Sequence, residues 1–170
     1  WELYAMWTLV PLLVASSSLA QVGPVAGLSF AIIGIGAVGC IVGGFVSRRT
    51  GSAPVAATAL AVSALCCALY PLISDAAPAL VLALMLLWGA SVVADSPHFS
   101  ALSAKACPPE IVGSALALQN ALGFAVTMVS IAWGTAVVDA WGAQVAWLLL
   151  PGPVLGLMAL RPLLGRRARA

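Results

Sequence analysis

The chain has 170 residues, of which 63% are hydrophobic and 7% are charged, and its formal net charge is +2. Soluble domains carry roughly 25% charged residues, so this composition excludes an ordinary soluble domain and indicates a protein of the lipid bilayer. We expect no nucleic-acid partner, because the few basic residues stand at the ends of apolar stretches, where anionic headgroups attract them.

Turn signals rich in Pro and Gly divide the sequence into six apolar stretches. A membrane-spanning helix needs about 20 residues, and uniformly apolar stretches do not alternate as barrel strands do. We therefore expect an all-α membrane protein with a single transmembrane domain over residues 1–170. The expected spans are about 1–19, 25–46, 54–73, 79–104, 111–138 and 143–160, followed by a basic tail at 161–170.

Lys and Arg follow only every second stretch. Arg48 and Arg49 follow the second stretch, Lys105 follows the fourth, and four arginines follow the sixth, whereas Asp75 and Asp139 occupy intervening breaks. Basic loops tend to stay in the cytoplasm. The pattern predicts a multi-pass protein of the plasma membrane whose basic loops and C-terminus are cytoplasmic.

Small residues are concentrated in two of the spans. The second span holds the GxxxG pair Gly39 and Gly43, a spacing that lets two helices approach closely. The fifth span holds a stripe of small and polar residues at helical spacing, which we expect to face protein or water. The stripe consists of Gly113, Asn120, Gly123, Thr127, Ser130 and Gly134. Of these, we expect Gly123 and Gly134 to pack against a neighbouring helix, as we expect of Gly39 and Gly43.

Asp95 is the leading candidate for a functional residue, because a charge inside the membrane is costly and uncommon. Ser91, Asp95 and His98 share one helical face, and Pro97 interrupts the backbone hydrogen bonds beside them. Two interpretations stay open. Asp95 and His98 line an aqueous path and exchange protons. Alternatively, they lie at the cytoplasmic interface, where they snorkel or form a structural or gating ion pair with Lys105 or Arg49.

Two further sets of residues are candidates for a substrate or proton pathway, Glu2 with Tyr4 and Gln119 with Asn120. Glu2 is either solvated or, if the first span extends upstream, held in the membrane between the aromatic rings of Tyr4 and Trp7. Gln119 and Asn120 either contact a solute or hydrogen-bond a neighbouring helix.

The cysteines, tryptophans and serines do not indicate a catalytic or metal site. Cys40, Cys66 and Cys67 lie in apolar stretches and are interpreted as small apolar residues, and their spacing does not suit a metal. The tryptophans Trp88, Trp133, Trp141 and Trp147 are interpreted as interfacial anchors or packing. We expect no enzyme activity, no metal and no cofactor, since no serine stands in an activating arrangement.

The sequence resembles the C-terminal six-helix half of a bacterial major facilitator superfamily transporter over essentially its whole length. The stretch from Gly44 to Gly51 is similar to the family's loop motif of Gly, three residues, Asp, Arg, one residue and Gly. Gly44, Arg49 and Gly51 match, and Arg48 stands where the motif has Asp. The stretch from Val112 to Leu116, and Gly134 with Asp139 and Gly142, resemble the two ends of the family's eleventh helix.

The resemblance implies half of a twelve-helix bundle built from inverted three-helix repeats. It implies that spans one, two, four and five line a central cavity, with spans three and six at the periphery, and that the loop from Gly44 to Gly51 takes part in gating. We expect a proton-coupled permease for a small solute in the bacterial inner membrane, working by alternating access with a homologous N-terminal half. The alternative is a membrane scaffold or inactive half-transporter.

Overall fold

The structure is a computed structural model, and it describes residues 1–165. These residues form helices and contain no strand, which confirms the predicted all-helical class. Arg166, Arg167 and Arg169, expected in a basic tail, lie outside the described residues. The helices are α1 (Leu3–Ala15), α2 (Val25–Thr50), α3 (Ser52–Ile73), α4 (Pro78–Ala94), α5 (Ser96–Ala106), α6 (Val112–Trp141), α7 (Ala146–Leu149) and α8 (Pro151–Gly165), with 3-10 turns at η1 (Ser18–Gln21), η2 (Pro109–Ile111) and η3 (Gly142–Val145).

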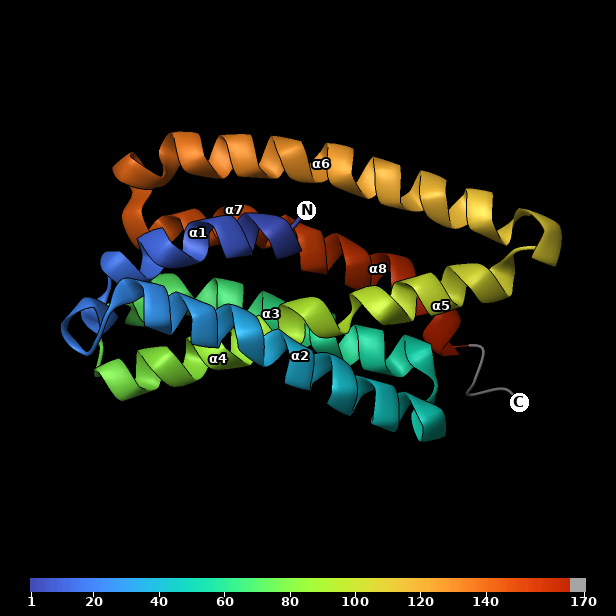
Figure 1. Ribbon diagram of the computed structural model, residues 1–170, viewed down its shortest axis with the longest axis horizontal. Coiled ribbons are helices and arrows are strands. Elements are labelled where there is room, and N and C mark those ends of the chain that lie inside the picture. The colour runs from blue at the N-terminus through green and yellow to red at the C-terminus, as the bar shows by residue number, and fades with distance from the viewer. Residues whose placement is uncertain (166–170) are drawn as a thin grey trace.

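The helices lie lengthwise in one bundle (Figure 1). Helix α4 packs against α2 and α3, and α8 packs against α3. Helix α6 forms one edge of the bundle and contacts α1, α5 and the η3–α7 segment. Figure 1 shows that the chain reverses direction between α1 and α2, α2 and α3, α3 and α4, and α5 and α6, whereas α5 continues in the direction of α4.

Four helical stretches in the described residues are long and apolar enough to cross a bilayer, namely Val25–Thr50, Ser52–Ile73, Pro78–Ala106 and Pro109–Leu164. Leu3–Ala15 is a shorter apolar helix. The structure thus gives five apolar stretches where the sequence predicts six spans. The difference arises because α6, η3, α7 and α8 follow one another with only Leu150 between helical residues, although Figure 1 shows that the chain folds back after α6.

Close approach between α2 and α4 depends on small residues. A Cβ added at Gly39 would collide with the carbonyl oxygen of Ala90, and one added at Gly89 would collide with the carbonyl oxygen of Ile32. Backbone atoms cannot yield as a flexible side chain can, so neither position admits a larger residue in this packing. The contact fixes α4 on α2, and α4 carries the fully buried Trp88 and Met85 into the core.

Two breaks in the helices have clear backbone causes. A single residue, Gly51, separates α2 from α3; its φ of 83° and ψ of 167° are accessible to glycine and strained for other residues. The expected span at 79–104 is divided into α4 and α5 at Asp95, two residues before Pro97, whose ring removes a backbone donor.

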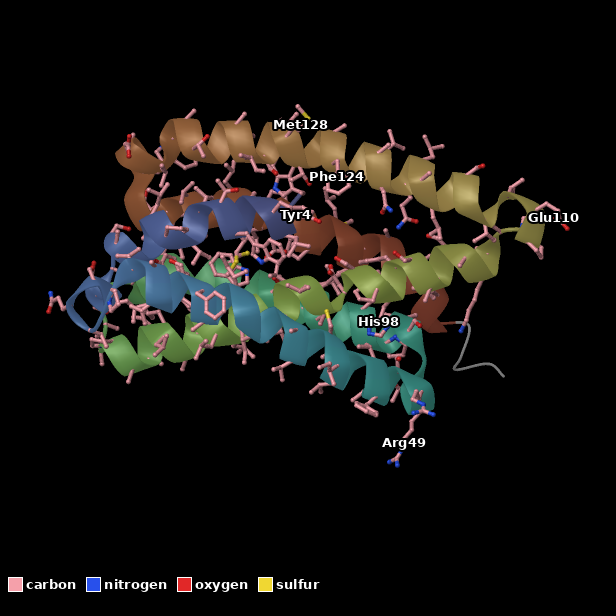
Figure 2. All side chains as sticks on the ribbon, viewed as in Figure 1. Tyr4, Arg49, His98, Glu110, Phe124 and Met128 are labelled. Atoms are coloured by element: carbon pink, nitrogen blue, oxygen red, sulfur yellow. The ribbon has the colours of Figure 1, made fainter. Side chains whose placement is uncertain are left out.

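The basic residues of the loops lie at one end of the bundle. Arg49 and Glu110 lie at the same end, where α2 meets α3 and α5 meets α6 (Figure 2). The α3–α4 turn, which contains Asp75, lies at the opposite end together with the end of α6 (Figure 1). Arg48, Arg49 and Lys105 therefore share one end of the structure.

Candidate functional site

The carboxyl group of Glu2 is buried in the centre of the bundle, with 8% of the residue exposed. Its Oε1 accepts hydrogen bonds from Ser63 Oγ at 2.5 Å, Trp88 Nε1 at 2.8 Å and Cys67 Sγ at 3.2 Å. Glu2 stands directly before α1, whereas its donors come from α3 and α4. The interpretation of Glu2 as a solvated terminal residue is wrong, because three helices enclose it.

The donors are placed by ordinary helix geometry. Ser63 and Cys67 are four residues apart on α3 and so lie on the same side, one turn above the other. Trp88 is fully buried, and a buried indole N–H requires an acceptor. Trp88 is therefore a core residue, and the interpretation of this tryptophan as an interfacial anchor is wrong. Cys67 is more than a small apolar filler, because its thiol faces the carboxyl.

Glu2 and Asp95 line one cavity of about 200 Å³. Asp95 is partly buried at the break between α4 and α5, and its Oδ1 accepts a hydrogen bond from Ser96 Oγ at 3.1 Å. Leu60 of α3 and the two glycines Gly152 and Gly156 of α8 form other parts of the wall. Helix α8 belongs to the sixth expected span, so a span expected at the periphery reaches this cavity.

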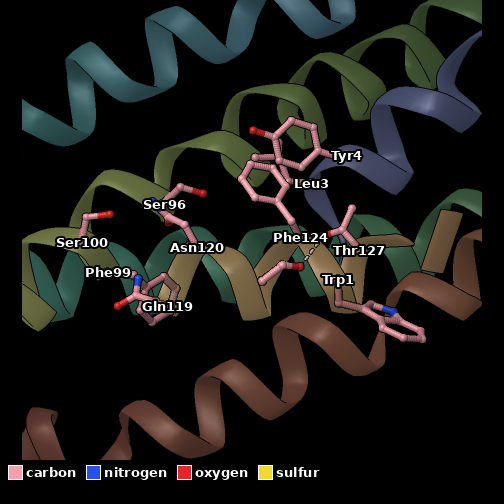
Figure 3. Close-up of a pocket in the computed structure, with 11 residues that line it drawn as sticks. Trp1, Leu3, Tyr4, Ser96, Phe99, Ser100, Gln119, Asn120, Phe124 and Thr127 are labelled. Atoms are coloured by element: carbon pink, nitrogen blue, oxygen red, sulfur yellow. Dashed lines mark hydrogen bonds between the residues drawn. The ribbon is translucent and has the colours of Figure 1, made fainter. Parts of the chain in front are cut away.

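A second cavity of about 350 Å³ lies between the start of α1 and the facing sides of α5 and α6 (Figure 3). Tyr4, Gln119, Asn120 and Phe124 line it. The rings of Tyr4 and Phe124 lie with their centroids 5.5 Å apart, and Gln119 Oε1 accepts a hydrogen bond from Ser103 Oγ. Helix α6 thus presents the middle of its small and polar stripe to this cavity, at Asn120, Gly123 and Thr127. Met128 points away from the bundle (Figure 2).

The two cavities adjoin, since both are lined by Trp1, Leu3, Ser96 and Phe99. Five of the residues singled out from the sequence therefore meet in one region between α1, α5, α6 and α8. They are Glu2, Tyr4, Asp95, Gln119 and Asn120. Helix α2, which the family resemblance placed at the cavity, contributes to neither lining.

His98 does not join this region. It is 5% exposed, and its Nε2 lies 3.1 Å from the position that a Cβ would take on Gly43 of α2. No hydrogen-bond partner reaches that nitrogen among the described residues. Asp95 and His98 are three residues apart and so are separated by about 60° around a helix, which in this bundle directs His98 to α2 and leaves Asp95 at the cavity.

The loop motif lies apart from the cavities, at the end of α2. Arg48 and Arg49 are exposed, and together with Phe45 and Val46 they line a surface hollow. Gly51 ends α2, and its N–H donates to the carbonyl of Ser47 at 2.7 Å. Gly44 is exposed, and an added Cβ there would meet no atom within 4 Å.

The glycines expected to pack helices behave differently from one another. Gly39 lies against Ala90, and Gly43 lies against His98 and Val55. Gly134 lies against Leu9 of α1. Gly123 was expected to pack in the same way, but it lines the larger cavity, and an added Cβ there would meet no atom within 4 Å.

Sequence reasoning missed Ser63, Cys67 and Trp88 as partners of a carboxyl. The one available signal was the pair Ser63 and Cys67 at helical spacing in a span without charge. This spacing indicates which side of α3 is polar, but it does not indicate which acidic residue that side faces.

Comparison with protein-family models, curated proteins and solved structures gives no match for this chain. What the protein does is therefore inferred from its own residues.

Proposed function

We propose that the chain is the C-terminal half of a secondary transporter of the major facilitator type, which moves a small solute by alternating access. The observation that carries the proposal is the pair of adjoining cavities, where Glu2, Asp95, Gln119 and Asn120 meet in a bundle of apolar helices. Ionisable groups in membrane helices characteristically mark a substrate or ion pathway, and transporters bind solute near mid-membrane between helices. The proposal includes no catalytic step and no cofactor.

The proposal takes the bundle to cross a bacterial inner membrane six times. The chain reverses after α6, so α6 and α8 run antiparallel and each accounts for one crossing in this arrangement (Figure 1). Helix α1 is 13 residues long and is shorter than the about 20 residues of a full crossing, and the proposal counts it as the first span. The end that carries Arg48, Arg49 and Lys105 is assigned to the cytoplasm, as basic loops favour.

Alternating access needs a second wall opposite the cavities. Helix α6 lies at the edge of the bundle, and its exposed side carries Leu118, Leu122 and Met128. A homologous six-helix half, in the same polypeptide or in a partner chain, supplies the missing wall in our proposal. A scaffold without transport activity would share the same bundle, but it would have no use for a cavity lined by acids and amides.

We further propose that protons drive the transport through Asp95 or Glu2. Moving one charge down a potential of 100 mV supplies about 2.3 kcal/mol, which corresponds to about fifty-fold accumulation of a solute. A carboxyl at the cavity can gain and lose a proton as the solute enters and leaves. The gating role of the Gly44 to Gly51 loop belongs to the same proposal.

The test is transport by the full-length protein reconstituted in liposomes, with a solute selected by its ability to raise the melting temperature of the purified protein. We expect uptake that depends on a proton gradient, and loss of that dependence in Asp95→Asn. Asp139→Asn removes the same charge at an exposed position outside the cavities and should leave uptake unchanged. Gradient-dependent uptake by Asp95→Asn would remove Asp95 from the coupling, and a folded protein that moves none of the stabilising solutes would favour the scaffold.

A further inference from the structure

The charged side chains that line the two cavities have one sign. The linings include the acids Glu2 and Asp95, and neither lining contains Lys, Arg or His among the described residues. An anionic solute would therefore meet two carboxyls and no positively charged side chain. Burying a charge without a partner is strongly unfavourable, so the cavities disfavour anions and suit a solute that brings a positive charge.

The two acids differ in how completely the protein supplies them with hydrogen bonds. Glu2 receives three donors on one oxygen from Ser63, Cys67 and Trp88. Asp95 receives one side-chain hydrogen bond, from the exposed hydroxyl of its neighbour Ser96. A carboxylate has about four acceptor positions. All three donors to Glu2 go to Oε1, so both acids keep acceptor capacity, and Asp95 keeps the larger share for a group that enters the cavity.

Aromatic rings stand beside the acids. Tyr4 and Phe124 line the larger cavity, and both remain partly exposed there, at 39% and 52%. Phe99 and Trp1 lie where the two cavities adjoin. Ring faces attract cations and cover apolar groups at the same time. The amide oxygens of Gln119 and Asn120 add neutral acceptors on the same side of α6.

We propose that the solute is an organic cation with an aromatic or apolar body, which places its positive charge toward Asp95 and its body against the rings of Tyr4 and Phe124. This rests on the proposed function, and it names the substrate class of that site. The volumes of about 350 Å³ and 200 Å³ place the site at the small end of ligand pockets, so the solute has the size of a substituted aromatic amine.

The test uses two ions that share one body and differ in the sign of a permanent charge. Benzyltrimethylammonium and benzylsulfonate are titrated into the purified full-length protein by calorimetry, with tetramethylammonium as a cation that lacks a ring. We expect saturable binding of benzyltrimethylammonium, weaker binding of tetramethylammonium and no saturable binding of benzylsulfonate. Asp95→Asn should weaken binding of the aromatic cation by about tenfold, and Asp139→Asn should not change it.

A second variant tests the ring independently of the acid. Tyr4→Leu keeps an apolar side chain and should lower the affinity for benzyltrimethylammonium by about fivefold, while the affinity for tetramethylammonium falls by less. If Asp95→Asn does not fold, the Tyr4→Leu titration still tests the inference. So does the comparison of benzyltrimethylammonium with benzylsulfonate on the unmodified protein. Saturable binding of benzylsulfonate as tight as that of the cation, or no saturable binding of the cation, overturns the inference.

The same measurements separate this inference from the proposed function. Transport of a neutral or anionic solute, with no binding of either cation, refutes the substrate class and leaves the transporter standing. Saturable, Asp95-dependent binding of the cation by a protein that transports nothing supports the cation site and refutes the transporter.

Discussion

The indole N–H of Trp88 donates a hydrogen bond to Glu2 Oε1 over 2.8 Å, joining α4 to the residue that opens α1. The two residues are 86 positions apart in sequence. Both are buried, so water cannot replace the indole if it is removed.

We expect Trp88→Phe to lower the stability of the protein by about 1–3 kcal/mol, because it leaves an acceptor of Glu2 short of one donor and removes part of a core ring. The melting temperature of the purified protein in detergent measures the effect. Trp133→Phe makes the same change at a residue that is 49% exposed and should shift the melting temperature much less. Equal shifts in the two variants would mean that the bond to Glu2 is not important for stability.

Gly89→Ala should be strongly destabilising, by about 1–3 kcal/mol, because the added Cβ meets the backbone of Ile32 and α4 must move away from α2. Gly34→Ala is the matched control, since an added Cβ there meets no atom within 4 Å. Alanine favours helix over glycine by up to about 1 kcal/mol, so this control should melt at the same temperature or higher. A harmless Gly89→Ala would contradict the close contact between the two helices.

Gly51→Ala should cost about 1–3 kcal/mol through backbone strain alone, because the conformation at φ 83° and ψ 167° is one that alanine rarely adopts. Gly23→Ala is the control. Gly23 also lies in a turn, but its φ is not positive and an added Cβ there would meet no atom within 4 Å. Thermal melting of both variants decides the point, and similar melting temperatures would show that the turn relaxes around an alanine.

The two ends of the bundle should be accessible from opposite sides of the membrane. Cys107 lies in the α5–α6 turn at the end shared with Arg49, and we expect a membrane-impermeant maleimide to label it only after the cells are opened. In a Cys107→Ser background, Asp139→Cys at the other end should be labelled in intact cells. Labelling of both positions from the same side would refute the proposed crossings.

The helical class followed from the sequence because lipid offers a backbone amide no partner, so long apolar stretches must be helices. The breaks were equally readable, since Pro, Gly and charged residues gather at them. What composition did not provide was the number of crossings. The turn after α6 is itself helical, and Gly142 reverses the chain there with a φ of 53°.

The sequence singled out individual residues of the candidate site, but it did not show how they are arranged. Glu2, Asp95 and Asn120 stood out because polar groups are rare in such a chain, and these three line the cavities. His98 was grouped with Asp95 on spacing alone, and a separation of about 60° around the helix was enough to direct it to another neighbour. The partners of Glu2 come from α3 and α4, and only tertiary packing shows which residue they meet.

The single-residue link at Gly51 restricts how the bundle can rearrange. One extended residue spans at most about 3.6 Å, so α2 and α3 cannot slide past each other by even one helical turn. They must travel as a pair, and α4 follows through its contact with α2. Helix α6 is tethered more loosely, by the segment from Cys107 to Ile111. Helix α1 is joined to α2 by a still longer segment, residues 16–24. Of the walls of the larger cavity, α1 and α6 are therefore the ones whose links leave most room to move.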